Sequence, residues 1–379
     1  MHIAVLGGGP GGLYFAYLWK KRHPDATVDL FEQNPAGATW GFGVVFSEQA
    51  LEFLRADDSE TVDAITPKME SWENITLNLR GESVALDGVG FSSIGRLDLL
   101  TILQQRASSA GVTLRYDTLI QSVDELKGYD VIVAADGLNS LVRRSFEGDF
   151  GTSLSYSSNK FAWYGISKRF ETLSQTFVKT DRGAFNAHHY RYSPSMSTFL
   201  VECDHATWAA YGFAYKDVDE SKAICEEVFA DMLGGRPLLS NKSVWRNFPW
   251  IWNEHWSFRN MVLIGDALHS AHFSIGSGTR LAIEDAIALV KALESEAHVT
   301  TALARYEAER KPIVKKLVTA ARTSADWYGK FPEHMKLDLM DFAYSYITRS
   351  GRIDDARLRA MSPAFMARYE ASKTDPGPS

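Results

Sequence analysis

The chain has 379 residues, more than one typical hydrophobic core holds, which favours two closely joined domains. Its 45% hydrophobic content predicts a soluble globular protein, and its formal charge of -7 argues against nucleic acid as a partner. Only Cys203 and Cys225 are cysteines, so we expect a reducing cytoplasm, no structural disulfide and no metal site. No apolar run has the length of a membrane span, so no membrane partner is expected.

The first chemical signal lies at the N-terminus. An apolar strand at residues 2–6 runs into a glycine-rich turn, and an amphipathic helix follows to about residue 22. The turn has the spacing of a dinucleotide-binding fingerprint at Gly7, Gly9 and Gly12. A second strand at 26–31 ends in Glu32, where a carboxylate can hold ribose hydroxyls. The combination predicts a bound dinucleotide.

Two later strands also end in a carboxylate beside a glycine. The strand at 129–135 leads into Asp136 and Gly137, and the strand at 261–264 leads into Gly265 and Asp266. Because the carboxyl ends of parallel strands meet at one edge of a sheet, both carboxylates can contact one extended ligand. The next turn carries Gly276 and Gly278 and opens an apolar helix near 281–293, whose free N–H groups favour anions and electron-rich carbonyls.

An NAD-dependent enzyme would share the first fingerprint, so other features must separate nicotinamide from flavin. The apolar loop at 41–47, ahead of a helix expected at 48–56, suits the wall of a flavin ring. Arg96 stands at the start of a helix expected at 97–107, where a cation opposes the helix dipole unless an anion lies beside it. A cofactor phosphate or a nearby carboxylate would serve. We therefore favour FAD.

The sequence changes character between these motifs. In residues 159–202, apolar and polar residues alternate and aromatic residues are frequent, which is typical of an antiparallel sheet. A period of two places His188, Tyr190 and Tyr192 on one face, a possible floor for an aromatic substrate, although a structural role is the alternative for each. Beyond residue 293 we expect helices, with a break at Pro312.

The domain boundaries that we expect follow from these segments. The FAD-binding domain comprises 1–70, 93–157 and 258–298, the substrate domain 71–92 and 158–257, the C-terminal helices 299–372, and a disordered tail 373–379.

The three motifs, with Ser140, Arg143 and His269, resemble those of the group A flavoprotein aromatic hydroxylases, the p-hydroxybenzoate hydroxylase type. Within that superfamily, segments 41–47, 271–279 and 342–350 are similar to the aryl-CoA monooxygenases, meaning salicylyl-CoA 5-hydroxylase and the N-terminal half of 2-aminobenzoyl-CoA monooxygenase. Phe273 and Arg280 replace the usual proline and asparagine of the superfamily, as in the aryl-CoA branch.

The resemblance implies an α/β fold with a Rossmann-type FAD-binding domain, an inserted antiparallel-sheet substrate domain and a helical C-terminus. It implies FAD, NADH or NADPH as a transient reductant, O2, and a flavin C4a-hydroperoxide that hydroxylates an aromatic ring. The implied substrate is a hydroxybenzoyl-CoA, such as salicylyl-CoA giving gentisyl-CoA, or an aminobenzoyl-CoA. The alternatives are a biosynthetic hydroxylase of a free or carrier-bound aromatic, of the tryptophan or indole type, and a flavin-binding protein without oxygenase activity.

Residue roles follow from the motifs and the resemblance together. Cofactor contacts are expected at Gly7, Gly9, Pro10, Gly11, Gly12, Glu32, Gln33, Val44, Arg96, Ile120, Asp136, Gly137, Asp266, Gly276, Ser277, Gly278 and Thr279. Substrate contacts are expected at Trp163, Phe199, His272, Phe273 and Ser274. Catalytic roles are expected at His188 and Tyr190, with His188 as the base or hydrogen-bond partner of a substrate hydroxyl.

Overall fold

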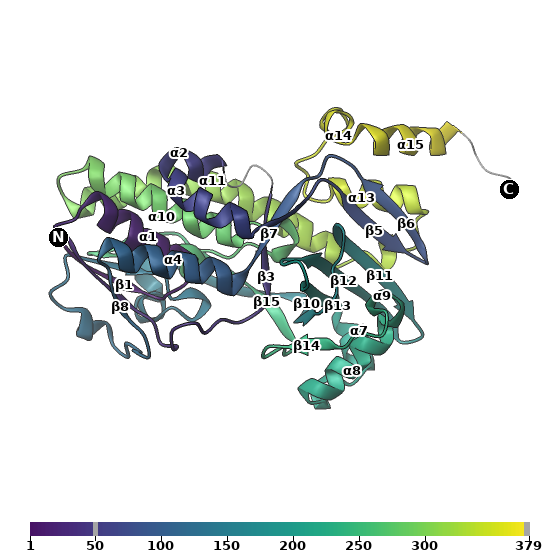
Figure 1. Cartoon of the computed structure of the whole chain (residues 1–379), viewed down its shortest axis with the longest axis horizontal. Helices are drawn as coiled ribbons and strands as arrows, with labels where there is room; N and C mark the ends of the chain where they lie inside the picture. The colour runs from purple at the N-terminus through teal and green to yellow at the C-terminus, as the bar shows by residue number, and fades with distance from the viewer. Residues whose placement is uncertain (48–51, 375–379) are drawn as a thin grey trace.

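A six-stranded sheet organises the half of the molecule on the left of Figure 1. The computed structural model describes residues 1–47 and 52–374. The sheet has the order β16-β17-β9-β1-β2-β8, formed by Ser257–Phe258, Met261–Leu263, Val131–Ala134, His2–Leu6, Thr27–Phe31 and Thr113–Arg115. All neighbours pair in parallel except β16 and β17, so the carboxyl ends of five strands meet at one edge. Helix α1 (Pro10–Arg22) packs between α4 (Arg96–Ala110) and α10 (Gly278–Ser295).

A second, mostly antiparallel sheet lies on the right of Figure 1. Its order is β14-β10-β13-β12-β11-β5-β6, with β15 paired to β10, and its strands are Leu238–Ser240, Thr152–Ile166, Ser197–Cys203, Gly183–Arg191, Leu173–Thr180, Ile75–Leu79, Glu82–Leu86 and Arg246–Asn253. Helices α7 (His205–Ala210), α8 (Val218–Val228) and α9 (Ala230–Leu233) follow β13, and apolar residues of α8 and α9 cover one face of the sheet. The opposite face is left to line a cavity.

A small sheet and a group of helices complete the chain. Strands β3 (Gly43–Ser47), β7 (Phe91–Gly95) and β4 (Glu70–Trp72) form an antiparallel sheet. Helices α2 (Glu52–Asp57) and α3 (Ser59–Ile65) lie between β3 and β4 in the chain. Helices α13 (Leu339–Thr348), α14 (Asp355–Met361) and α15 (Pro363–Thr374) cap the outer end near β6. The expected α/β fold with an inserted antiparallel sheet and a helical C-terminus is therefore confirmed. In the described part of the chain, no helix is both long and apolar enough to cross a membrane.

The expected helix break at Pro312 is wrong. Helix α11 (Val299–Tyr328) runs for 30 residues through this proline. A proline inside a helix costs about 3 kcal/mol, because it removes one backbone hydrogen bond and crowds the preceding turn. The helix continues because both sides of the proline are anchored: Tyr306 and Val314 are buried in the core of the first domain, and Tyr328 is buried near the second sheet.

Two other element boundaries differ from those expected. The helix expected at 48–56 is seen as α2 from Glu52 onward, and residues 48–51 lie outside the described residues. The tail was expected to be disordered from residue 373, but α15 (Pro363–Thr374) extends to Thr374. Residues 375–379 lie outside the described residues.

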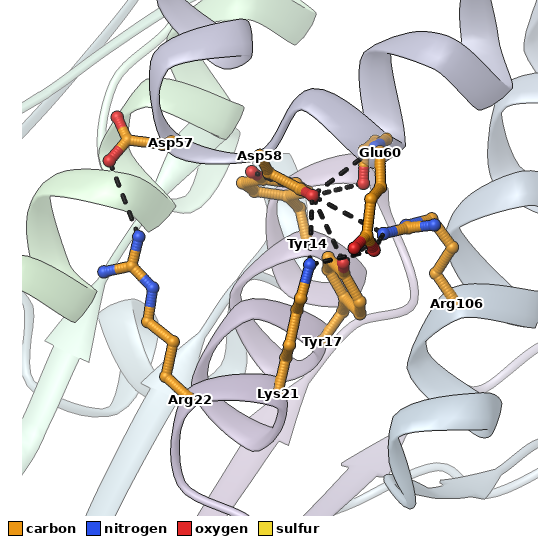
Figure 2. A network of polar contacts seen from close by, with 9 residues as sticks. Tyr14, Tyr17, Lys21, Arg22, Asp57, Asp58, Glu60 and Arg106 are labelled. Atoms are coloured by element: carbon orange, nitrogen blue, oxygen red, sulfur yellow. Dashed lines mark hydrogen bonds and ion pairs between the residues drawn. The ribbon is translucent and has the colours of Figure 1, made fainter.

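A buried carboxylate, Asp58, holds α3 against α1 and α4 (Figure 2). It accepts hydrogen bonds from the hydroxyls of Tyr14 (3.5 Å) and Tyr17 (3.3 Å), and it lies 3.5 Å from both Lys21 Nζ and an Arg106 nitrogen. The Asp58 side chain also caps the first turn of α3, because its Oδ1 accepts from the Thr61 backbone N–H at 3.4 Å. One charge therefore connects three helices.

We expect Asp58→Ala to lower the free energy of unfolding by about 2 kcal/mol, because it removes a helix cap and leaves buried donors without an acceptor. Urea denaturation with FAD in constant excess measures this. The control is Asp63→Ala, which removes an exposed ion pair with Arg55 and should cost less than about 1 kcal/mol. Equal losses in the two variants would contradict the assignment.

Candidate active site

The glycines of the first fingerprint allow two close approaches of backbone and leave one open position. Gly7 has φ +98°, and a Cβ there would lie 2.4 Å from the carbonyl oxygen of Ala135. A Cβ on Gly12 would lie 2.2 Å from the carbonyl oxygen of Gly7. A Cβ on Gly9 would meet no atom within 4 Å, so the backbone there is open to a ligand. The turn can therefore bring backbone N–H groups against a cofactor phosphate at the start of α1.

The predicted ribose acid, Glu32, is oriented by its neighbours. Its Oε2 accepts from the Gly8 backbone N–H (2.7 Å), and its Oε1 accepts from the Asn34 N–H (2.8 Å) and side-chain amide (2.7 Å). These bonds fix the carboxylate beside the fingerprint while leaving lone pairs for a ligand. Gln33 is exposed, and Ile120 packs half-buried against the core.

A cavity of about 420 Å³ joins the carboxyl edge of the first sheet to the open face of the second. Of the predicted residues, its wall includes Gly9, Pro10, Gly11, Val44, Arg96, Gly137, Trp163, His188, Tyr190, Asp266, Phe273, Ser274, Gly276, Ser277, Gly278 and Thr279. The wall does not include Gly7, Gly12, Glu32, Gln33, Ile120, Asp136, Phe199 or His272. The two expected sites are thus parts of one continuous space.

The cofactor end of this cavity contains polar atoms that the protein leaves unpartnered. Arg96 is the first residue of α4, and its Nε is buried without a hydrogen-bond partner among the described residues. Burial lowers the pKa of this guanidinium, and Asp266 opposes that shift. The side chain of Asp266 is exposed to the cavity. The low-polarity surroundings of the cavity raise the pKa of its carboxyl, and His269 and Arg96 act against this rise. Asp136 lies nearby with its Oδ1 buried and unpartnered.

These unpartnered groups fit FAD, whose phosphates need donors and whose ribityl and ribose hydroxyls need acceptors. Asp136 Oδ2 already accepts from the Leu141 N–H at 2.7 Å, and burial raises the pKa of the Asp136 carboxyl. Asp266 supplies one negative charge near Arg96, and the unpartnered Arg96 Nε leaves a donor that fits a cofactor phosphate.

A buried network fixes the turn that carries Asp266. Asp285 on α10 accepts from the Gly265 N–H at 3.1 Å, lies 2.8 Å from His269 Nε2, and accepts from Arg310 Nε at 2.9 Å. Burial alone would raise the pKa of Asp285, but His269 and Arg310 outweigh it and hold this pKa below its usual value. The carboxylate stays charged beneath the cavity.

The predicted catalytic histidine faces the cavity with both ring nitrogens already occupied. His188 Nδ1 lies 2.9 Å from Gln175 Nε2, and His188 Nε2 lies 3.3 Å from Glu202 Oε2. Because the Tyr328 hydroxyl donates to Gln175 Oε1 (3.2 Å), the Gln175 amide donates to Nδ1, and the ring proton lies on Nε2 toward Glu202. Burial, and to a smaller extent Arg349, lower the pKa of His188 to about 3. The imidazole is therefore neutral at neutral pH, and the unperturbed pKa expected for this residue does not apply.

Glu202 is a residue that the sequence did not single out. It is 1% exposed and also accepts from Asn159 Nδ2 at 2.8 Å. Burial raises the pKa of this carboxyl, while His272 and the Asn159 hydrogen bond act against the rise. Its direct partners are Asn159 and His188, and the network continues from His188 through Gln175 to Tyr328, so only the folded chain brings these groups together.

Tyr190 shares the His188 face, but its hydroxyl donates to the Gly43 carbonyl at 2.8 Å. Burial raises the pKa of this phenol. Its ring, rather than its hydroxyl, is thus presented to a ligand. Tyr192, expected on the same face, lies beyond the end of β12 against Gly43 and does not line the cavity.

Two of the residues expected to contact substrate lie outside the cavity wall. Phe199 is 0% exposed and points to the far side of the sheet, because its neighbours Thr198 and Leu200 take the cavity side. His272 lies behind the wall, where its Nδ1 accepts from the Ser274 N–H at 3.3 Å and its ring packs on Phe248. Burial lowers the pKa of His272 to about 4, although Glu202 opposes the shift.

The remaining expected contacts lie on the aromatic part of the wall. The ring of Phe273 is 4.9 Å from that of Phe161 and 5.3 Å from that of His188, and Trp163 packs against Gly41. Phe161 was not predicted, although the alternation that places Trp163 on this face also places Phe161 there. This end of the cavity offers flat apolar surfaces for an aromatic ring.

The fold and cavity define a flavin-dependent enzyme, and sequence comparison agrees. Residues 129–321 match the family described as the FAD binding domain. A salicyloyl-CoA 5-hydroxylase of a Streptomyces species is 38% identical over 98% of this chain and 73% of its own length. A 3-hydroxy-4-methyl-anthranilyl-[aryl-carrier protein] 5-monooxygenase of Streptosporangium sibiricum is 35% identical, over 93% of this chain and 95% of its own.

A protodeoxyviolaceinate monooxygenase of Chromobacterium violaceum is 32% identical over 96% of each chain. The crystal structure of a 2-methyl-3-hydroxypyridine-5-carboxylic acid oxygenase variant has a TM-score of 0.71 at 17% identity, covers 95% of this chain and 96% of its own, and shows a shared fold. The chain belongs to the FAD-dependent aromatic monooxygenases of the p-hydroxybenzoate hydroxylase type. Its cofactor is FAD, and NAD(P)H is the reductant typical of this family.

We expect Arg96→Gln to weaken FAD binding about 10- to 100-fold, because a charged, desolvated donor to the cofactor is lost. Flavin released during gel filtration, and titration of apoprotein with FAD, measure the change. Lys68→Gln is the control, since Lys68 pairs with Asp98 on the outside of the same helix start (3.2 Å) and should retain FAD normally. Normal FAD retention by Arg96→Gln would show that this arginine serves only Asp266.

Proposed function

We propose that this enzyme hydroxylates the aromatic ring of an aryl-CoA thioester, either a hydroxybenzoyl-CoA such as salicylyl-CoA or an aminobenzoyl-CoA. The observation that carries the proposal is the single cavity whose cofactor end continues into an aromatic end. The relative with 38% identity, a salicyloyl-CoA 5-hydroxylase, supports this substrate class.

The residues of the chain have limited tasks in this reaction. Bound FAD supplies electron transfer from NAD(P)H and the activation of O2. Phe161, Trp163 and Phe273 exclude water and hold the substrate ring flat. His188 presents a neutral ring edge, and Glu202 is a positioning residue that keeps the His188 proton on Nε2. Tyr190 contributes its ring to the floor.

A second candidate is a biosynthetic hydroxylase that acts on a carrier-bound or indole-type aromatic. It is favoured by the relatives that are 35% and 32% identical, whose names give an aryl-carrier-protein substrate and a violacein precursor. Both relatives align over nearly the whole chain, as the first one does. The candidates differ in the group attached to the ring and, for the indole type, in the ring itself.

Substrate-dependent NAD(P)H oxidation by the purified holoenzyme, with product mass, tests the proposal. We expect salicylyl-CoA, 4-hydroxybenzoyl-CoA or 2-aminobenzoyl-CoA to accelerate oxidation and to gain one oxygen atom. Free salicylate, free anthranilate and tryptophan are the comparison compounds. If a free acid or an indole is hydroxylated while every thioester is inert, the second candidate replaces the first.

We expect Glu202→Gln to lower kcat for product formation roughly tenfold, equivalent to about 1.4 kcal/mol, because an amide replaces the carboxyl group that orients His188. FAD content should be normal, since Glu202 lies outside the cofactor end. A positioning role also predicts that a smaller fraction of oxidised NAD(P)H yields product. Glu226→Gln is the control, because Glu226 pairs with Lys222 on the outer helix at 2.9 Å. Unchanged coupling in Glu202→Gln would contradict the role.

A further inference from the structure

Three arginines line the cavity, and they differ in how the protein satisfies them. Arg349 donates from Nε to Ser324 Oγ (3.0 Å) and from its terminal nitrogens to the carbonyls of Tyr346 (2.7 Å) and Ser274 (2.9 Å). Arg96 belongs to the cofactor end and interacts with Asp266. Within 1–47 and 52–374, Arg246 forms no side-chain hydrogen bond or ion pair, and its recorded contact is the ring of Phe161 at 5.7 Å.

The position of Arg246 places it at the rim of the substrate end. It is the first residue of β15 and pairs with Phe161 on β10, one of the aromatic walls. Its side chain is exposed and also lines the cavity, so it stands where the cavity meets solvent. Partial burial lowers the pKa of the guanidinium. A partly desolvated cation without a carboxylate partner is a favourable place for an anion.

A second cation lies on the same connection between β14 and β15. Lys242 Nζ is 3.5 Å from the centroid of the exposed Trp40 ring, and no ion pair of Lys242 occurs in the described residues. Asn241 joins the connection between β14 and β15 to the segment before β3, because its side-chain amide donates to the carbonyls of Thr39 (3.2 Å) and Gly41 (3.1 Å). Gly41 in turn packs on the cavity wall at Trp163. Lys242 does not line the cavity itself, but its neighbour Asn241 is tied to the segment that packs on Trp163, and Lys242 lies four residues before Arg246 in the chain.

We propose that Arg246, assisted by Lys242, binds the phosphate of the phosphopantetheine arm that is common to CoA thioesters and carrier-protein thioesters. This inference rests on the proposed function, because it assumes that the aryl group enters the cavity as a thioester. A guanidinium can bind a phosphate through two parallel hydrogen bonds, whereas an ammonium acts as a point charge. Arg246 is therefore assigned the larger share.

The test compares Arg246→Gln with the wild-type holoenzyme on salicylyl-CoA and on salicyl-pantetheine, which lacks the phosphate. We expect the KM for salicylyl-CoA to rise about 10- to 100-fold and the KM for salicyl-pantetheine to change less than about twofold. Lys242→Gln should give a smaller rise. Arg259→Gln is a matched control, because Arg259 is an exposed guanidinium over Phe258 (4.9 Å) at the opposite edge of the first sheet.

Further arms separate the sources of the phosphate. If Arg246→Gln weakens binding of a salicylated carrier protein as well as of salicylyl-CoA, the phosphate that both thioesters share is the one bound, whichever thioester is the natural substrate. If Arg246→Gln instead slows flavin reduction by NAD(P)H without thioester, the phosphate belongs to the nicotinamide nucleotide and the proposal is overturned. Equal KM changes for the CoA and pantetheine thioesters would also overturn it.

Titration with CoA that carries no aryl group, monitored by flavin fluorescence, separates this proposal from the proposed function. If no thioester is hydroxylated but CoA binds the wild type and not Arg246→Gln, the function fails and the phosphate site stands. If thioesters are hydroxylated and CoA binds both proteins equally, the function stands and the phosphate site fails. If thioesters are neither bound nor hydroxylated, both fail.

Discussion

The active-site edge depends on one buried charge, the carboxylate of Asp285. A fully buried carboxylate is costly unless donors satisfy it, and here Gly265, His269 and Arg310 do so. The donors belong to the turn after β17 and to α11, while Asp285 itself belongs to α10. Because His269 and Arg310 keep the pKa of Asp285 below its usual value, the three segments remain joined across the neutral pH range. Asp266 can face the cavity because this charge holds its turn in place.

The cofactor end could be predicted from sequence because each of its parts is encoded locally. A glycine at a position with φ +98° or at a backbone contact of 2.2 Å has no substitute, so the fingerprint at Gly7 and Gly12 is written directly in the residue types. Strand-end carboxylates such as Asp136 and Asp266 follow apolar runs that a parallel sheet requires. The rule that parallel strands end at one edge then brings them together without knowledge of distant contacts.

The substrate end could be predicted only in part, since its details depend on partners that are distant in sequence. Period two correctly placed His188 and Tyr190 toward the cavity, but it could not show that Gln175, Glu202 and Gly43 occupy their polar atoms. The same periodicity, applied strand by strand, would have turned Phe199 away from the cavity. The helix break predicted at Pro312 failed for a related reason, because the packing that outweighs the local cost of the proline involves both domains.

The satisfied polar groups of the substrate end limit how the enzyme can select its substrate. His188, Tyr190 and Arg349 all spend their hydrogen bonds on the protein, so the wall offers a ring mainly flat apolar surfaces. Such surfaces discriminate weakly between aromatic rings of similar size, because a missing methyl or an added hydroxyl in an apolar pocket changes binding by only about 1–3 kcal/mol. Stronger selection must come from groups that remain unpaired until a ligand arrives. At the rim, Arg246 is such a group among the described residues. In the proposal above, it separates thioesters that carry a phosphate from free aromatic acids, and it does not separate CoA thioesters from carrier-protein thioesters.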